Sequence, residues 1–164
     1  MDREQNLFYE EQKIPTIAKI IMLIGCAAII AVLIVSMLQN DDETKAKSLL
    51  ILTTVNSAII GLAAIAVLYT KLIVYVDKDF INIRFYPFML KSKKLPIKNL
   101  QRYYVRKYRP FMEYGGWGIR WNSNGRAYSI KGNMAIQLEF KSGSKILIGT
   151  QKPDDFKKAF DCNC

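Results

Sequence analysis

The sequence predicts an α+β membrane protein in which a hairpin of two transmembrane helices precedes an antiparallel β domain that ends in one helix. The hairpin is predicted by two apolar runs, Ile20 to Leu38 and Leu49 to Tyr69, which contain no Asp, Glu, Lys or Arg. The β domain is predicted by the alternation of apolar and polar residues after Lys71, since a period of two is typical of half-buried strands. The closing helix is predicted by a proline followed by two acids, beginning at Pro153.

Both apolar runs are long enough to cross a bilayer, whose hydrocarbon core of about 30 Å requires roughly 20 helical residues. The segment between them carries Asp41, Asp42 and Glu43 and leaves room only for a tight turn outside the lipid. We therefore expect a transmembrane hairpin over residues 17–70.

The charge distribution predicts the orientation of this hairpin. Residues 1–70 hold five Lys/Arg and seven Asp/Glu, whereas residues 71–164 hold nineteen Lys/Arg and seven Asp/Glu, a net charge of +12. Because Lys and Arg near transmembrane ends tend to stay in the cytoplasm, we expect both termini and the β domain to be cytoplasmic, in a bacterial inner membrane. The alternative is that the first run is a signal peptide. Its 19 residues exceed a usual hydrophobic region, and the segment before it is acidic.

Residues 1–16 are polar, end near Pro15 and are expected to be an irregular or interfacial lead-in, with Phe8 and Tyr9 at the headgroup level. Within the hairpin, small residues at four-residue spacing let helix backbones approach closely, either within the chain or in a homo-oligomer. These candidate packing residues are Ala27, Ala31, Ser57 and Gly61, with the polar Asn56 beside them.

The β domain is expected over residues 71–161, followed by a tail at 162–164. Alternating segments predict strands at 72–76, 81–86, 93–97, 101–108, 118–122, 126–131, 134–140 and 145–149. Phe156 and Phe160 are four residues apart on the final helix and would dock on the sheet. A small antiparallel barrel of about seven strands capped by that helix, or an orthogonal sandwich of the same strands, accounts for this order.

This order resembles the bacterial pleckstrin-homology-like domains, particularly those attached to a pair of N-terminal membrane helices. The resemblance covers roughly residues 72–161 and rests on residues 116–120 (Gly-Trp-Gly-Ile-Arg), 129–132 (Ser-Ile-Lys-Gly) and 146–156, where a closing strand and Gly-Thr lead into the capping helix. It implies a fold more than an activity. Pleckstrin-homology domains that bind phosphoinositides use a basic loop between their first two strands, whereas this chain has Asp77-Lys78-Asp79 there.

The residue types argue against an enzyme. The chain has no histidine, which removes the commonest general base and metal ligand. The acids of the β domain have structural explanations in turns or at a helix start, so we expect no catalytic residue, no metal and no cofactor. Cys162 and Cys164 allow a prenylated or metal-binding tail, but two thiols are poor metal ligands and the chain already has an anchor, so a frayed terminus is the better explanation.

The strand at 101–108 is the candidate binding feature. Its period of two places Arg and Tyr on one face, a combination that can accept phosphates and lie against acyl or sugar surfaces. The residues of that face are Arg102, Tyr104, Arg106 and Tyr108, and neighbouring segments add Lys91, Lys93, Lys94, Lys98 and Arg109. Either an anionic phospholipid or a protein is the expected partner. Nucleic acid is not expected at a membrane-bound domain.

Only Thr70 and Lys71 separate the second apolar run from the first strand, so one end of the domain should stay against the headgroups. We therefore expect a non-enzymatic, membrane-anchored interaction module. The alternative is a small oligomeric transport or channel subunit that uses the polar patch of the second helix, Thr53 to Ser57.

Overall fold

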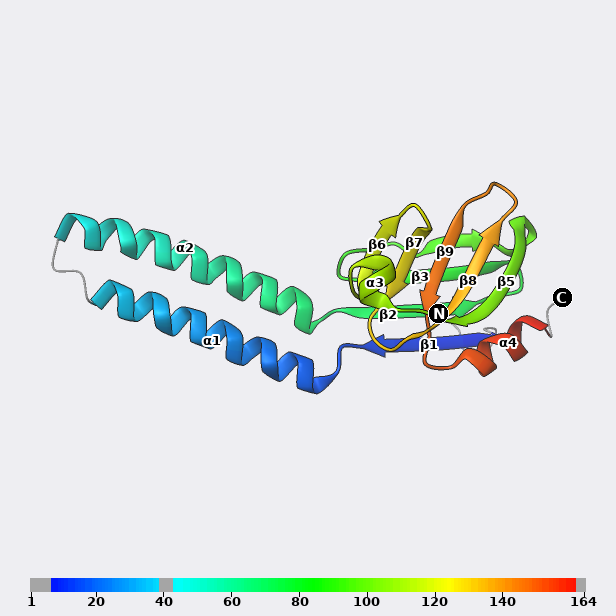
Figure 1. Ribbon diagram of the computed structural model, residues 1–164, viewed down its shortest axis with the longest axis horizontal. Helices are drawn as coiled ribbons and strands as arrows, with labels where there is room; N and C mark the ends of the chain where they lie inside the picture. The colour runs from blue at the N-terminus through cyan, green and yellow to red at the C-terminus, as the bar shows by residue number, and fades with distance from the viewer. Residues whose placement is uncertain (1–6, 39–42, 162–164) are drawn as a thin grey trace. The chain divides into compact units, whose positions relative to one another are not determined.

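The structure is a computed structural model that describes residues 7–38 and 43–161. It contains two compact units, a helical unit of Ile14–Tyr69 and a β domain that combines Met1–Lys13 with Thr70–Cys164. The predicted order of two long apolar helices, then β-sheets, then a C-terminal helix is confirmed (Figure 1). The predicted turn around Asp41 and the Cys162/Cys164 tail lie outside the described residues.

The helical unit consists of α1 (Thr16–Leu38) and α2 (Glu43–Leu68). Each contains a segment long and apolar enough to cross a membrane, Thr16–Ser36 in α1 and Leu50–Leu68 in α2. These spans agree with the apolar runs of the sequence. A helix of about 20 residues with no charge at its centre is long and apolar enough to cross a bilayer.

The β domain consists of two sheets. The first has the order β1-β2-β3-β4, and its strands are β1 (Phe8–Lys13), β2 (Lys71–Val76), β3 (Phe80–Tyr86) and β4 (Lys93–Pro96). The second has the order β5-β8-β9-β7-β6, and its strands are β5 (Leu100–Lys107), β6 (Gly118–Asn122), β7 (Gly125–Ser129), β8 (Met134–Phe140) and β9 (Lys145–Gly149). Short helical segments follow β4, β5 and β9, namely η2 (Ile97–Asn99), α3 (Pro110–Tyr114) and α4 (Pro153–Asp161).

The interpretation of residues 1–16 as an irregular lead-in was wrong, because residues 8–13 form β1. This strand pairs antiparallel with β2, from Phe8 opposite Val76 to Lys13 opposite Lys71. Its side chains alternate between buried and exposed along the whole strand. The alternation is hidden in the sequence because two of its three buried positions, Glu10 and Gln12, are polar.

These two buried side chains join β1 to the end of β9. The Glu10 carboxylate accepts hydrogen bonds from Thr150 Oγ1 at 2.6 Å and from the backbone N–H of Gln151 at 2.7 Å. Gln12 Nε2 donates to the Gly149 carbonyl oxygen at 2.7 Å. Since buried polar groups are costly without partners, these bonds explain how a polar segment can be an integral strand of the sheet.

Of the two expected arrangements of the strands, the closed antiparallel barrel is not seen in the part of the chain that the structure describes. Among the described residues the strands form two separate sheets, η2 lies between β4 and β5, and β7 pairs parallel with β9. Helix α4 reaches both sheets through aromatic contacts. Phe156 packs edge-on against Phe8 of β1, with ring centroids 5.1 Å apart, and Phe160 lies 4.4 Å from Tyr103 of β5. The helix therefore bridges strands from both sheets, and the predicted docking of its two phenylalanines is confirmed.

We predict that the β domain folds without the helical unit only when β1 is retained. Because Lys13 and Lys71 are paired, a two-residue Asn-Gly turn can join residues 7–13 directly to residues 71–161. This grafted domain should be soluble and unfold cooperatively on heating, as followed by circular dichroism. Residues 71–161 alone leave the β2 edge unpaired and Phe156 uncovered, so they should aggregate or melt at a lower temperature. Equal melting temperatures for the two proteins would contradict the structural role of β1.

Candidate functional site

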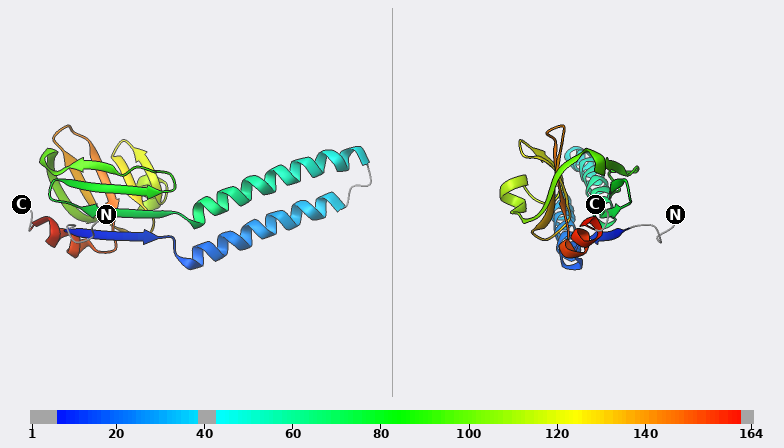
Figure 2. Two further views of the ribbon diagram at one scale, coloured as in Figure 1. Left: turned by 180° about the vertical axis from the view of Figure 1, so that it is seen from behind. Right: turned by 90° about the vertical axis from the view of Figure 1, so that its right-hand side faces the viewer.

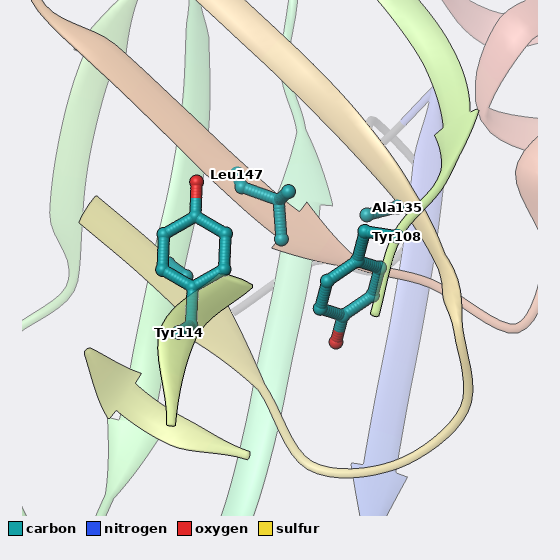
Figure 3. Close-up of a cluster of buried hydrophobic side chains, with 5 residues drawn as sticks. Tyr108, Tyr114, Ala135 and Leu147 are labelled. Atoms are coloured by element: carbon teal, nitrogen blue, oxygen red, sulfur yellow. The ribbon is translucent and has the colours of Figure 1, made fainter. Parts of the chain in front are cut away.

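The predicted Arg/Tyr face of β5 is only partly present. Arg102 is exposed, and Tyr104 and Arg106 are half-buried. Tyr108 was wrongly assigned to this face, because β5 ends at Lys107 and the Tyr108 side chain is only 2 % exposed. It packs in a core cluster with Tyr114, Ala127, Ala135 and Leu147 (Figure 3).

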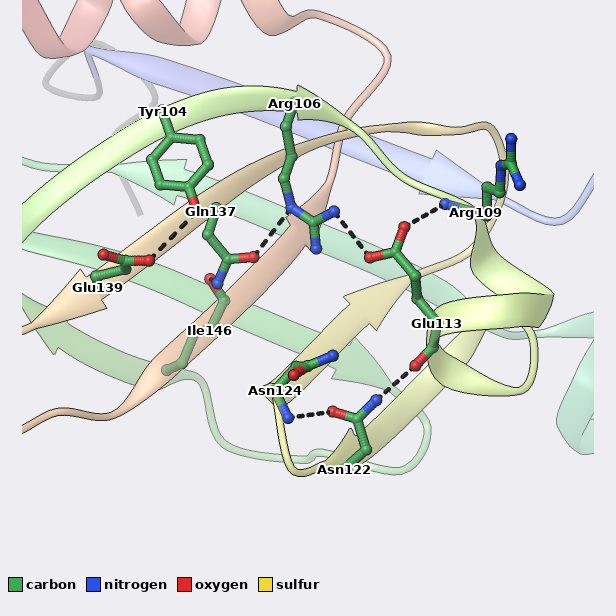
Figure 4. A network of polar contacts seen from close by, with 9 residues as sticks. All are labelled: Tyr104, Arg106, Arg109, Glu113, Asn122, Asn124, Gln137, Glu139 and Ile146. Carbon is green, nitrogen blue, oxygen red and sulfur yellow. Dashed lines mark hydrogen bonds and ion pairs between the residues drawn. The ribbon is translucent and has the colours of Figure 1, made fainter.

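Both arginines of this face are paired with acceptors on β8 and α3. Arg102 Nη2 lies 2.9 Å from Glu139 Oε2, and the guanidinium stacks 5.0 Å from the Tyr104 ring centroid. The Tyr104 hydroxyl donates to Glu139 Oε1 at 3.3 Å. Arg106 Nε donates to Gln137 Oε1 at 3.3 Å (Figure 4). Arg102 and Arg106 are therefore held by groups within the domain.

Glu113 completes this network from α3. Its carboxylate lies 2.8 Å from Arg106 Nη1 and accepts a hydrogen bond from the Arg109 backbone N–H at 2.7 Å (Figure 4). Partial burial acts to raise the Glu113 pKa, but these two hydrogen bonds and the positive charges bring it below its usual value. The pKa of Glu139 is lowered in the same way, since the Arg102 and Lys145 charges outweigh its desolvation. Glu113 and Glu139 thus balance the two arginines, which weakens this face as an anion site.

The predicted lysines belong to the first sheet and its connections, and the structure does not gather them onto the β5 face. Lys93 and Lys94 lie on β4, where Lys93 Nζ is 5.7 Å from the Tyr128 ring centroid and Lys94 Nζ is 5.8 Å from that of Phe80. Lys91 precedes β4, and Lys98 lies in η2; both are exposed.

A second surface, which the sequence analysis missed, lies on α3 and β6. Three of its apolar side chains are strongly exposed: Phe111 at 64 %, Met112 at 82 % and Trp121 at 74 %. Trp117 packs edge-on against Phe111, with ring centroids 4.9 Å apart. Arg109 and Arg120 are exposed beside them. We call these six residues the α3–β6 surface.

Local backbone geometry builds this surface. Proline at the first position of α3 suits a helix start, and Gly115 ends the helix in the left-handed conformation, with φ of 70°. The Trp117 indole N–H donates to the Gly132 carbonyl oxygen at 3.0 Å, and Arg120 Nε donates to the Trp117 carbonyl oxygen at 3.2 Å. The rings are therefore fixed in place while remaining in contact with solvent.

An open hollow lies beside α3 and is lined by residues 107–113 and Asn133. It brings the cationic residues Lys107 and Arg109 next to the apolar Phe111 and Met112. Within the described ranges, Lys107 and Arg120 form no ion pair with a carboxylate. Arg120 of the α3–β6 surface and the neighbouring Lys107 therefore offer positive charge that no carboxylate of the described residues pairs with, unlike Arg102 and Arg106.

The sequence contained a signal for this surface. Residues 110–121 hold four aromatic side chains within a stretch that has no period of two. The short helix α3 was not predicted, so the exposed face that it creates with β6 was not recognised.

The predicted helix-packing residues differ in how deeply their side chains are buried. Ser57 and Gly61 are half-buried, whereas Ala27, Ala31 and Asn56 are exposed. The side chains of the polar patch bond to their own helix: Thr53, Thr54 and Asn56 donate to carbonyl oxygens one turn earlier. Self-association through the small residues stays a prediction.

Among the described residues, no group of three or more His, Cys, Asp or Glu side chains is arranged to hold a metal ion. Comparison of the chain with protein families, curated proteins and solved structures found no match. The resemblance to bacterial pleckstrin-homology-like domains therefore stays an interpretation of the sequence pattern.

We predict that Glu113→Gln lowers the stability of the protein near neutral pH and reduces its loss of stability in acid. A carboxyl whose pKa is lower in the folded state than its value of 4.5 in the unfolded chain stabilises above pH 4.5, and this contribution disappears as pH falls through the folded pKa. Denaturant unfolding between about pH 3 and pH 7 measures this difference. With Arg106→Gln as the second variant, a double-mutant cycle should give a coupling of about 0.5–1 kcal/mol. No coupling would contradict the ion pair.

Proposed function

We propose that this chain is a non-enzymatic, membrane-anchored interaction module whose β domain binds anionic phospholipid headgroups through the α3–β6 surface. In this proposal α1 and α2 span a bacterial inner membrane, and the β domain, of pleckstrin-homology-like type, lies in the cytoplasm. The observation that carries the proposal is the exposure of Phe111, Met112 and Trp121 beside arginines.

The chemistry of this surface fits a membrane interface. Tryptophan is enriched at headgroup level because its ring is apolar and its indole N–H is polar. Arginine forms strong, often bidentate hydrogen bonds with phosphate. Each Lys or Arg near an anionic bilayer contributes about 1 kcal/mol to binding. Exposed apolar residues that lie next to one another on a soluble surface generally mark a contact site.

The position of the surface within the β domain supports the same proposal. Figures 1 and 2 place α3, β6 and β7 toward the end of the domain at which β1 ends and β2 begins. Lys13 and Lys71 are paired at that end, and both candidate membrane spans connect to it through the chain. A surface near these connections can meet headgroups without a separate recruitment step.

The transport alternative has weaker support. The polar side chains Thr53, Thr54 and Asn56 each donate a hydrogen bond to a carbonyl oxygen of α2 itself. They are therefore not held ready for an ion or a solute, and we do not propose this function.

We predict that the grafted domain, residues 7–13 joined to 71–161, floats with anionic vesicles but not with neutral ones, and that added salt weakens this binding because it screens charge. Arg109→Glu/Arg120→Glu should abolish the binding. Lys157→Glu/Lys158→Glu is the matched control, since it makes the same charge change on exposed residues of α4.

Equal losses of binding in the two double variants would show that net charge alone attracts the domain and would contradict a specific surface. If the folded domain fails to bind anionic vesicles even at low salt, the lipid proposal is wrong. The α3–β6 surface should then be tested against protein partners.

A further inference from the structure

The connection between β3 and β4, residues 87–92, exposes two large apolar side chains. Phe88 is 62 % exposed and Leu90 is 73 % exposed. The connection is held in one conformation: the Met89 backbone N–H donates to the Phe85 carbonyl oxygen at 2.6 Å, and the rings of Phe85 and Phe88 lie 6.1 Å apart. The two exposed side chains are thus presented by an ordered turn beside the core.

The pairing register locates this turn within the β domain. Tyr86, the last residue of β3, is opposite Lys71, the first residue of β2, and Lys71 is also opposite Lys13 of β1. Residues 87–92 therefore leave the sheet at the end where β1 ends and β2 begins. Figure 2 shows this end of the first sheet from behind.

The covalent chain places a bilayer near this end once α1 and α2 span it. Two residues, Ile14 and Pro15, separate β1 from α1, and two residues, Tyr69 and Thr70, separate α2 from β2. Three Cα-to-Cα steps reach at most about 10 Å. Both Lys13 and Lys71 are therefore tethered close to the membrane surface, and the turn that follows Tyr86 begins beside them.

Charge around the turn is complementary to an anionic membrane. Lys91 is exposed directly after Leu90. Lys71 lies across the register, with its Nζ 5.8 Å from the Tyr86 ring centroid and 3.8 Å from Glu11 Oε1, so Lys91 is the cation at this turn that no carboxylate of the described residues pairs with. Apolar side chains flanked by lysines are typical of segments that bury their apolar part among acyl chains and keep their cations at the phosphates.

We propose that the β3–β4 connection inserts Phe88 and Leu90 into the interfacial region of the bilayer that holds α1 and α2. This inference rests on the membrane anchoring in the proposed function but not on headgroup binding by the α3–β6 surface. With the two chain connections, the inserted turn forms a third point of attachment, which restricts the tilt of the β domain relative to the membrane plane.

The test uses the full chain reconstituted in anionic vesicles, with nitroxide spin labels and power-saturation measurements of their collisions with oxygen and with a water-soluble nickel chelate. The labelling background is Cys26→Ala/Cys162→Ser/Cys164→Ser. Labels are introduced one at a time by Phe88→Cys and Leu90→Cys. Both positions are exposed, so folding should tolerate them.

Two further labels provide the controls. Ile24→Cys, on the exposed side of α1, reports whether the helix lies in lipid. Ser142→Cys reports the water-exposed opposite end of the β domain. The backbone N–H of Lys141, in the β8–β9 turn, donates to the Asn99 carbonyl oxygen of η2. The N–H of Ile97, also in η2, donates to the carbonyl oxygen of Asp79 in the β2–β3 turn. The β8–β9 turn therefore lies at the end of the domain where β2 ends and β3 begins.

The expected result is that labels at 88 and 90 collide more with oxygen and less with the nickel chelate than the label at 142 does. Labels at 88 and 90 that behave like the one at 142 would overturn the inference while leaving the anchoring intact. Shielding from both reagents would also overturn it and would indicate a protein contact. A water-exposed label at 24 would show that the anchoring itself is wrong and would overturn the inference with it.

Discussion

The antiparallel pairing of β1 with β2 is the interaction on which the rest of the β domain depends. The two strands are separated in the chain by the whole helical unit, yet Lys13 and Lys71 are direct neighbours in the sheet. Closing so long a loop is entropically costly, so contacts specific to β1 must offset that cost. The hydrogen bonds of Glu10 with Thr150 and Gln151, and the packing of Phe8 on Phe156, are such contacts.

This pairing links the fold to the proposed function. Because both candidate spans connect to paired strand ends, one end of the first sheet carries the connections to both spans. The β3–β4 connection, with Phe88 and Leu90, leaves from the same end. Arginines that are neutralised inside the domain, such as Arg102 and Arg106, lie on β5, whereas Arg109 and Arg120 belong to the α3–β6 surface. Ion pairs within the domain therefore mark the arginines of β5 as part of a stabilising network, in contrast to the arginines of the proposed contact surface.

Much of this fold could be predicted from periodicity. The ranges of β6, β8 and β9 agree with the alternating segments, and Pro153 with two acids marks the start of α4. What could not be predicted depends on tertiary contacts. The polar side chains of Glu10 and Gln12 are buried with partners supplied by the end of β9 and by the two residues that follow it. The parallel pairing of β7 with β9 joins strands that are not consecutive. The pairing of Arg102 with Glu139 likewise becomes visible only when β5 lies beside β8.

The most direct test of the central claim is a disulfide cross-link between β1 and β2 in the full chain within membranes, in a background without the native cysteines. Tyr9 is opposite Tyr75, so Tyr9→Cys/Tyr75→Cys should form an intramolecular disulfide on mild oxidation. Tyr9→Cys/Val74→Cys should not, because Val74 is buried and lies on the opposite face of the sheet. Equal cross-linking of both pairs, or cross-links only between chains, would contradict a β domain completed by the segment that precedes the first helix.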